Sequence, residues 1–520
     1  MNQTWNILKK NSGTGETKRA VLRSLMACFL IIAAGCATLR PVDLPVETAL
    51  APADSELWTT LATARSDDWF ELLNTGDEAL QWRLRAMDSA DRSIDLQTFL
   101  WKNDPTGLRI IRHILAAADR GVRIRILVDD TFTLNENDTI YNIDRHPNIQ
   151  FRIYNPFGRR YDSMVLRQLM NLGEFTRLNH RMHNKVLVVD NRAAILGGRN
   201  LADEYFGFHP SANFRDMELL AAGPVVQSIS QRFDDYWNSN WSFPVGRILD
   251  IPAPDRDLEA LRVWLEENLD LKQVEDPAAR HAAWLAVARS GISGEAFLLS
   301  DQPAHENPAA ASELPTQLAQ ALITWMERAD SELVLVSAYL IPTPELEDAI
   351  ERAERRGVSV RILTNSLRSN NHTAAHSAYR NHIKRLVGHG ADVHEMRARA
   401  KDRSIYMQTP VAEKDLGLHA KLLLIDDDLT FIGSANLDPR SLRLNTEIGI
   451  LVRSTEFNRL LREKLEIDFH TRNAWHLQTD ADGRLVWVAD DTVLESQPAA
   501  SRFQLLEDWF LGILPIEAEM

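Results

Sequence analysis

The chain has 520 residues, of which 45% are hydrophobic and 25% are charged, and its net charge at pH 7 is −15. This length and composition are those of an ordinary globular protein with about two to four domains. The acidic balance excludes a general attraction to nucleic acid, so no stable nucleic-acid partner is expected.

The first 35 residues have the pattern of a signal peptide. Five basic residues precede an apolar run at 25–34, which is shorter than the ~20 residues that cross a bilayer. The sequence Ala33-Ala34-Gly35-Cys36 resembles a bacterial lipobox, which implies cleavage before Cys36 and lipidation of Cys36. The alternatives are an uncleaved anchor and ordinary cleavage at small residues. The resemblance implies a lipid-anchored protein of the bacterial cell envelope that faces the periplasm, and Ala37 in place of Asp points to the outer membrane.

Cleavage at this position has two consequences for the mature chain. Cys28 leaves with the leader, so Cys36 becomes the only cysteine, and neither a disulfide framework nor a cysteine zinc site can form. Five basic residues and one acidic residue leave as well, which changes the net charge to −19. Residues 36–65 then begin the mature chain, and their richness in proline, alanine and acidic residues predicts a tether.

Residues 66–243 are predicted to form a first lobe, in which a polar motif follows a strand, a helix and a second strand. The strand pattern covers 94–101, the helical pattern covers 108–120, and the second strand follows Gly121. The motif, within 177–204, predicts a hairpin of two buried strands that brings its last residue back near its first two. Its residues are His183, Lys185, Asp190, Gly197, Gly198 and Asn200. The two glycines leave room for close approach by a backbone or a ligand.

The same motif recurs 236 residues later, within 413–440. Its residues are His419, Lys421, Asp426, Gly433, Ser434 and Asn436, and the preceding strand and helix patterns recur with it. An internal repeat of this length predicts an α/β fold with two duplicated α-β-α lobes that form one active site at their interface. The second lobe is predicted at 316–473, after a proline-rich connector at 244–315 and before a strand-and-helix tail at 474–520. The helix at 503–514 could pack on the core or lie on a membrane, and the core is favoured.

The paired His-x-Lys-x4-Asp motifs resemble the phospholipase D superfamily. Further segments resemble the C-type branch of the bacterial cardiolipin synthases: Arg181-Met182, Asp203, Tyr205-Phe206-Gly207, 362–366, 438–441 and 445–447. The resemblance covers roughly residues 65–515. It implies phospholipid substrates, a membrane surface as partner and a monomeric catalytic unit.

The residue types in the motifs suit attack on a phosphodiester. Lys185 and Lys421 supply positive charge, and the amides of Asn200 and Asn436 supply donors to the non-bridging oxygens, so we expect neither a metal nor another cofactor. The resemblance implies that His183 attacks phosphorus and forms a phosphatidyl-histidine. It also implies that His419 protonates the departing alcohol and then activates the incoming hydroxyl.

The resemblance further implies one acidic residue that orients each imidazole. In the first half this is Asp216, with Glu218 as the nearby alternative, and in the second half it is Glu447. The motif aspartates, Asp190 and Asp426, are expected to hold the hairpins rather than to touch substrate.

Two inserts directly precede the motifs, at 154–181 and 367–403, and both combine arginines with apolar residues. They could form a mouth that receives anionic lipid heads while apolar side chains touch acyl chains, or they could be solvated helix faces. The second insert also contains His372 and His376 at helical spacing. Because no His-Glu-x-x-His pattern accompanies them, we expect hydrogen-bonded or exposed histidines there instead of metal ligands.

Three functions remain open at this point. The first is a phosphatidyltransferase that makes cardiolipin from phosphatidylglycerol and a second phospholipid, either phosphatidylglycerol or phosphatidylethanolamine. The second is a phospholipase D-type phosphodiesterase that releases phosphatidic acid, with a nuclease disfavoured by the acidic charge and the anchor. The third is a non-catalytic lipid-binding scaffold, against which the intact motifs in both halves count.

Overall fold

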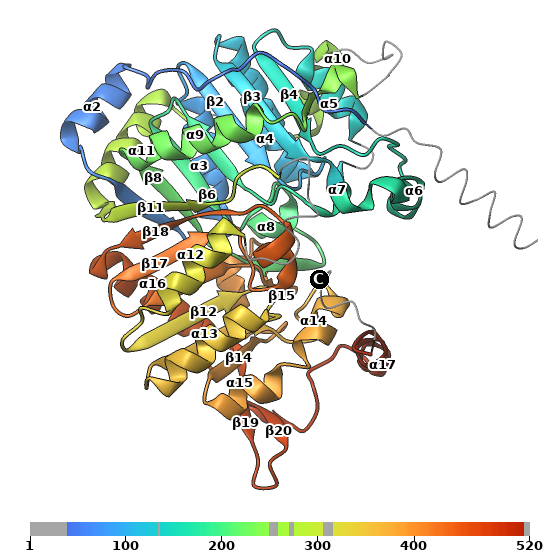
Figure 1. The fold of residues 1–520 in the computed structure, drawn as a ribbon. Helices are drawn as coiled ribbons and strands as arrows, with labels where there is room; N and C mark the ends of the chain where they lie inside the picture. The colour runs from blue at the N-terminus through green and yellow to red at the C-terminus, as the bar shows by residue number, and fades with distance from the viewer. Residues whose placement is uncertain (1–38, 134–135, 249–257, 270–274, 305–315, 514–520) are drawn as a thin grey trace, which may run out of the picture.

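The computed structural model describes residues 39–133, 136–248, 258–269, 275–304 and 316–513. The predicted signal peptide and Cys36 lie outside these residues. Two lobes lie one above the other, and each is a mixed sheet with helices on both faces (Figure 1). The predicted α/β fold with two duplicated α-β-α lobes is confirmed.

The first lobe contains a sheet of nine strands. In spatial order they are β10 (Ile292–Ser293), β1 (Trp69–Leu73), β8 (Glu218–Ala222), β6 (Ala193–Gly197), β5 (Val186–Val189), β2 (Ser93–Thr98), β3 (Arg123–Asp129), β4 (Ile149–Tyr154) and β9 (Ser242–Pro244). Strands β2, β3 and β4 are parallel, and the other pairs are antiparallel.

The second lobe contains a sheet of ten strands that repeats this order. They are β11 (Glu295–Ser300), β18 (Ile448–Arg453), β17 (Leu429–Gly433), β16 (Lys421–Ile425), β12 (Glu332–Ser337), β13 (Ser359–Asn365), β14 (Asp392–Met396), β19 (Ala474–Thr479), β20 (Leu485–Ala489) and β21 (Thr492–Leu494). The motif hairpins, β5–β6 and β16–β17, therefore sit at equivalent central places, where burial on both faces accounts for their unbroken apolar sequences.

One face of each sheet is covered by a layer of several helices. In the first lobe these are α2 (Glu56–Ala64), α3 (Gly76–Asp88), α4 (Pro105–Asp119), α5 (Asn137–Asp144), α8 (Asp203–Phe206), α10 (Leu258–Asn268) and α11 (Pro277–Ser290). In the second they are α12 (Gln317–Met326), α13 (Pro344–Arg355), α14 (Thr373–Tyr379) and α15 (Ile383–His389). The repeated helices α4 and α13 begin with the same signal, a capping side chain followed by proline.

The other faces of the two sheets share one core that joins the lobes. It includes α9 (Val225–Trp237) of the first lobe and α16 (Thr455–Phe469) of the second. Two further helices, α6 (Met164–Met170) and α7 (Phe175–Asn179), lie in the first insert, and α17 (Arg502–Leu511) ends the described chain. No helix in the described ranges is long and apolar enough to cross a membrane.

Three segments differ from the sequence-based expectation. The predicted tether is ordered from Leu39 onward and lies on the first lobe, where Val42 and Ala53 donate backbone hydrogen bonds to Asn240 and Asp190. The predicted connector contributes α10 and α11 to the first lobe and edge strands, β10 and β11, to both sheets. The predicted tail extends the second sheet with β19, β20 and β21. Edge strands are short and partly exposed, so their sequences carry a weak pattern.

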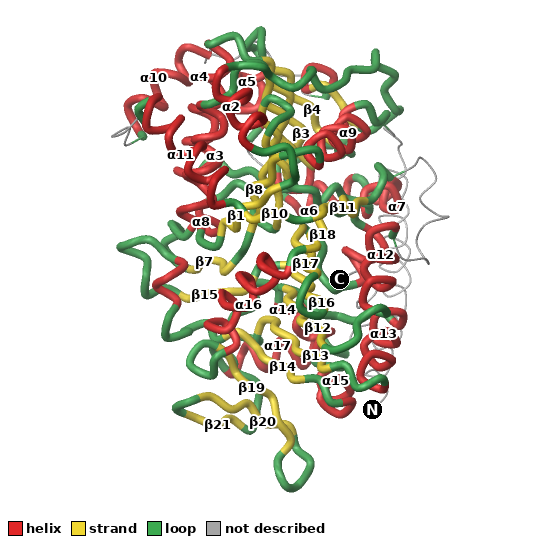
Figure 2. The backbone as a smooth tube through the Cα atoms, turned by 90° about the vertical axis from the view of Figure 1, so that its left-hand side faces the viewer, coloured by secondary structure: helices red, strands yellow, loops and turns green. Residues whose placement is uncertain are grey.

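A short parallel pair of strands connects the lobes. Strand β7 (Ala212–Arg215) of the first lobe pairs with β15 (Asp415–Leu418) of the second, and Figure 2 shows the pair between the two lobes. Each of these strands runs directly into a residue of interest, because Asp216 follows β7 and His419 follows β15. The lobe interface therefore fixes the places of these two side chains.

Candidate active site

Both motif histidines lie at the lobe interface, and each is held by the backbone of the opposite lobe. His183 precedes β5 and donates its backbone N–H to the carbonyl of Thr446 at 2.9 Å. His419 precedes β16 and donates its backbone N–H to the carbonyl of Arg215 at 2.8 Å. Both side chains are buried. The interface of the lobes therefore builds the site, as the duplicated motif predicts.

The carboxylates that hold the imidazoles also come from the opposite lobe. His183 Nδ1 lies 2.9 Å from both carboxylate oxygens of Glu447, and His419 Nδ1 lies 2.7 Å from Asp216 Oδ2. The sequence identifies these carboxylates but does not say which histidine each one contacts. Because Nδ1 is engaged in both rings, Nε2 is the nitrogen left to meet a substrate.

Glu218, the alternative to Asp216, has a different role. Its carboxylate forms a buried ion pair with Arg83 and lies 3.6 Å from Arg199. It is thus engaged within the first lobe, and the geometry favours Asp216 as the partner of His419.

The two motif lysines lie beside the histidines and are buried. Lys185 Nζ donates to the carbonyl of His183 at 2.7 Å, and Lys421 Nζ donates to the carbonyl of His419 and lies 2.9 Å from its Nδ1. Burial lowers the pKa of Lys185 to about 7 and that of Lys421 to about 8. An anion bound beside them would restore the charged forms, as required of groups that neutralise a phosphate.

Both imidazoles are neutral in the free site. Burial, followed by repulsion from Lys185 and Lys421, lowers the pKa of His183 well below its usual value. Burial and then Lys421 lower the pKa of His419 to about 3. A neutral imidazole has the free lone pair that a nucleophile needs.

The two carboxylates titrate differently. Burial opposes ionisation of Asp216, but the hydrogen bond and charge interaction with His419 together lower its pKa. Burial raises the pKa of Glu447 to about 7. The first carboxylate is therefore ionised at neutral pH, and the second is poised to exchange a proton.

These pKa values predict the pH dependence of kcat/KM. The charged lysines are present below their pKa values of about 7 and about 8, and His183, the nucleophile, stays neutral well below pH 6.5. We expect a plateau at mildly acidic pH, a fall that approaches tenfold per pH unit between pH 7 and 8, and a steeper fall of about 100-fold per pH unit above pH 8, where both lysines lose their charge. Initial rates across pH 5–10 measure this, and a rate that rises through pH 8 would contradict the assignment.

Small residues after each hairpin allow the carboxylates to approach. A Cβ at Gly198 would overlap the Asp216 carboxylate, and a Cβ at Gly433 would lie 2.6 Å from the carbonyl oxygen of Ile448. Gly197 has a φ of +156° and packs against Met217 and Glu218. At the position equivalent to Gly198, Ser434 fills the space and donates its hydroxyl to Glu447. The two halves thus place their carboxylates by different means.

Gly198→Ala should lower activity by about 10²-fold, because the new methyl group displaces Asp216 from His419. Steady-state rates and denaturant unfolding of the same preparation measure this. Gly246→Ala is the matched control, since nothing lies within 4 Å of its Cβ position. Unchanged activity in Gly198→Ala would show that the position of Asp216 is unimportant.

The remaining motif residues divide into two groups. The amide oxygens of Asn200 and Asn436 have no hydrogen-bond partner within the described residues, so these oxygens can accept a hydrogen bond from a ligand. Asp190 instead accepts the N–H groups of Asp91, Arg92 and Ser93, and Asp426 accepts equivalent bonds from residues 330–332. The aspartates thereby fix the backbone that enters β2 and β12, in accord with a structural role.

Aromatic rings enclose the histidines, a role that the sequence pattern does not predict for them. Phe99 meets His183 edge-on at 4.9 Å between ring centroids, Tyr205 meets His419 at 5.0 Å, and Phe214 meets His419 at 5.2 Å. Phe99 lies just after β2, the strand that pairs with the motif strand β5. Its place near the end of the strand predicted at 94–101 is the sequence feature that could have indicated this role for Phe99. Buried Asp438, whose pKa burial raises to about 7, also lies near Lys421.

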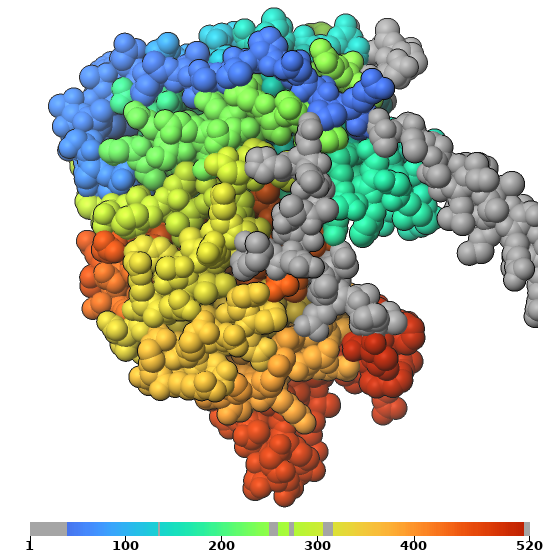
Figure 3. Space-filling model, in the orientation of Figure 1, coloured from blue at the N-terminus to red at the C-terminus, as the bar shows by residue number. Residues whose placement is uncertain are grey.

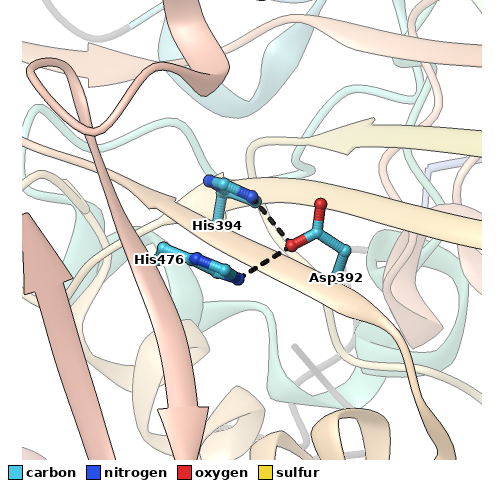
Figure 4. A group of neighbouring side chains, drawn as sticks. All are labelled: Asp392, His394 and His476. Atoms are coloured by element: carbon cyan, nitrogen blue, oxygen red, sulfur yellow. Dashed lines mark hydrogen bonds and ion pairs between the residues drawn. The ribbon is translucent and has the colours of Figure 1, made fainter.

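One cluster of histidine and aspartate outside this site could hold a metal ion within the described residues. His394 and His476 lie directly opposite each other on β14 and β19, and their Nε2 atoms lie 3.0 Å and 2.9 Å from Asp392 Oδ1 (Figure 4). The two rings are parallel to within 1°, and both Nε2 atoms meet the same carboxylate oxygen. Arg361 also lies 3.6 Å from the carboxylate. The cluster is a hydrogen-bonded pair of histidines on one carboxylate.

Comparison with known proteins agrees with this geometry. The family model "Cardiolipin synthase, PLD-like domain" matches residues 84–237 and 322–469. Cardiolipin synthase C of Escherichia coli K12 is 34% identical over 454 residues, which are 85% of this chain and 93% of that protein. Cardiolipin synthase B of the same organism is 25% identical over 398 residues, which are 76% and 79% of the two chains.

A solved structure shares the fold. The phosphatidylserine synthase of Haemophilus influenzae Rd KW20 superimposes with a TM-score of 0.53 at 15% identity, and the match covers 81% of this chain and 92% of that one. The duplicated fold and the paired motifs define an enzyme of the phospholipase D superfamily, acting as a phosphatidyltransferase or phosphodiesterase. Within that superfamily, the chain belongs to the cardiolipin synthase family of phospholipase D-like proteins.

Proposed function

We propose that this protein is a phosphatidyltransferase that joins a phosphatidyl group to a hydroxyl of phosphatidylglycerol and so makes cardiolipin. The observation that carries the proposal is the symmetric pair of buried histidines, each held through Nδ1 by a carboxylate of the other lobe. Two buried lysines beside them supply the charge for one phosphodiester. The name of the similar E. coli cardiolipin synthase C supports the choice of product.

The first chemical step is attack by His183 on phosphorus. Its neutral Nε2 forms a P–N bond, and the P–O bond to the leaving alcohol breaks. His419 gives its proton to that alcohol oxygen. Its pKa of about 3 belongs to the free site. The bound phosphodiester anion offsets the positive charge of the lysines, which lets His419 carry a proton at neutral pH.

The second step reverses these roles. His419, now neutral, takes the proton of an incoming hydroxyl, whose oxygen forms a new P–O bond as the P–N bond breaks. A phosphatidylglycerol hydroxyl gives cardiolipin, and water gives phosphatidic acid. Lys185, Lys421 and the amides of Asn200 and Asn436 contact the non-bridging oxygens in both steps.

The phosphatidyl donor is phosphatidylglycerol or phosphatidylethanolamine, and the two lipids leave different alcohols. We place the enzyme at the periplasmic surface of a bacterial membrane, held by a lipid on Cys36 and acting as a monomeric catalytic unit. Cys36→Ala should lack the covalent lipid that mass spectrometry finds on the wild-type protein, and an unchanged lipid content would rule out this anchor.

Product analysis tests the proposed reaction. The purified full chain is incubated with phosphatidylglycerol, with and without phosphatidylethanolamine, and the lipids are identified by mass spectrometry. Cardiolipin as the main product supports the transferase, and its dependence on phosphatidylethanolamine identifies the donor. Phosphatidic acid alone would make the enzyme a phospholipase D-type hydrolase, and no product in a folded protein would favour a lipid-binding scaffold. His183→Ala is the blank.

A further inference from the structure

The first insert contains a helix whose polarity is inverted. On α6, the guanidinium of Arg167 is fully buried, where it lies 3.7 Å from Asp130 and bonds to the carbonyls of Asp130 and Tyr161. Several apolar side chains between 165 and 175 face outward instead, and Val165 is 67% exposed. The exposed set is Val165, Leu166, Leu169, Leu172 and Phe175. The predicted basic face is therefore turned inward, and solvent meets the apolar face.

The last described helix, α17, is inverted in the same way. Its buried residue is Asp508, which is 1% exposed and bonds to His376 Nδ1 and Ser377 Oγ at 3.0 Å and to Arg380 at 3.1 Å. Its exposed large side chains are Phe503, Leu506, Trp509 and Phe510, and Ile513, two residues after the helix, is exposed as well. Phe503 is 73% exposed. The prediction that the apolar face of this helix packs on the core is wrong. The polar contacts of Asp508 occupy the inner face of the helix, and the apolar side chains are exposed.

These two apolar surfaces lie on the same side of the molecule. Figure 1 shows α6 and α7 projecting from the first lobe and α17 projecting from the second, and Figure 3 shows both segments at the same edge with a hollow between them. Exposed apolar side chains are normally scattered, and a contiguous set on one side marks an interaction site. A flat partner could meet both surfaces at once.

Both surfaces connect to the histidines through short paths. Exposed Phe132 stacks edge-on with Phe99 at 5.3 Å, and Phe99 in turn meets His183. Asn179, at the end of α7, accepts hydrogen bonds from Arg440 in the second motif region. On the other side, Gln504 of α17 donates to the carbonyl of Leu367, just beyond β13. These contacts join the segments that carry the two surfaces to the segments that carry the histidines.

The start of the described chain lies on this side too. Leu39 packs on the cluster that contains Trp241, and the guanidinium of Arg177 on α7 lies 4.4 Å from the Trp241 ring. Cys36 is three residues before Leu39, and three residues span at most about 10 Å. A lipid on Cys36 would thus enter a bilayer close to α7.

We propose that the exposed apolar side chains of 165–175 and 503–513 insert together into one phospholipid bilayer and hold the lobe interface against the membrane. The occupant follows from the phospholipid substrates of the proposed function, on which this inference rests, and from the place of Leu39, three residues after the proposed lipid site. The mode is insertion of apolar side chains into the headgroup region, since the nearby arginines are already paired.

Site-specific fluorescence tests this surface. An environment-sensitive fluorophore is attached to Leu169→Cys, Leu506→Cys or Ile467→Cys in the full chain carrying Cys28→Ser and Cys36→Ser, so that each chain has one thiol and no lipid. Ile467 is a matched control because it is exposed on α16, at the opposite side of the molecule. With vesicles of phosphatidylglycerol and phosphatidylethanolamine, we expect a blue shift at 169 and 506 and none at 467.

Two outcomes of the fluorescence experiment would contradict the proposal. No shift at 169 or at 506, or an equal shift at 467, would overturn the two-helix surface. A blue shift that grows with protein concentration in the absence of vesicles would indicate that this surface binds a second copy of the chain. This result would also overturn the proposed insertion into the bilayer. The fluorophores report docking even when no reaction occurs. A protein that docks but makes no cardiolipin would therefore contradict the proposed function and leave the docking surface supported.

Activity provides a second readout. The double variant Leu169→Ser/Leu506→Ser should lose about tenfold in rate on vesicles, because two apolar anchors are removed. The same variant should keep its rate on a dispersed short-chain phosphatidylglycerol. Equal losses on both substrates would place these side chains in the chemistry or the folding of the enzyme and would contradict docking.

Discussion

Replacing either motif histidine with alanine should abolish turnover. We expect His183→Ala and His419→Ala each to lower kcat by about 10⁴-fold or more, because residues that act as one unit each cost nearly the whole rate. The double variant should be no worse than either single variant. Rates of lipid conversion on phosphatidylglycerol vesicles measure all three.

The control for this series is His281→Ala, on α11 of the covering helix layer of the first lobe. It should keep wild-type activity. Denaturant unfolding of every variant separates loss of chemistry from loss of fold. A histidine variant that is folded and retains full activity would remove the two-step mechanism.

The second large effect concerns the carboxylates that cross between the lobes. Glu447→Gln and Asp216→Asn should each lower kcat by about 10³-fold with little change in KM. An amide can donate a hydrogen bond to Nδ1, which favours the tautomer with hydrogen on Nε2. This removes from His183 the lone pair that attacks phosphorus and from His419 the lone pair that takes the proton of the incoming hydroxyl. We propose that these two residues position the histidines without touching substrate.

A readout beyond activity separates this role from a structural one. Because burial raises the pKa of Glu447 to about 7, its replacement should also change the pH profile of kcat near neutrality. Asp427→Asn, in an exposed turn, is the matched control and should leave both rate and profile unchanged. Glu447→Gln with activity within twofold of wild type would refute the proposed role.

Much of this arrangement could be predicted from local sequence. The apolar, partly β-branched runs after His183 and His419 specify buried strands, and the turns after Asp190 and Asp426 specify hairpins. Repetition at a constant offset of 236 residues then indicates two equivalent lobes. The site residues follow because spacing on a strand determines which side chains share a face.

The contacts between the lobes could not be predicted in this way. Nothing in the local pattern says that Glu447 meets His183 or that Asp216 meets His419, because those contacts depend on how the lobes pack. The outward orientation of the apolar faces of α6 and α17 could not be predicted either, for a related reason. An apolar stripe usually packs inward, but in α6 and α17 a buried ion pair or hydrogen-bond network takes the inner face.

The most direct test of a single active site with a histidine intermediate is to trap that intermediate. The enzyme is mixed with a phospholipid labelled in its phosphatidyl group, quenched in base within one turnover and digested, and the peptides are analysed by mass spectrometry. We predict one phosphatidyl group on the peptide that contains His183, none on the peptide that contains His419, and none in His183→Ala. A label on His419 would reverse the two roles, and turnover without any covalent label would contradict the histidine mechanism.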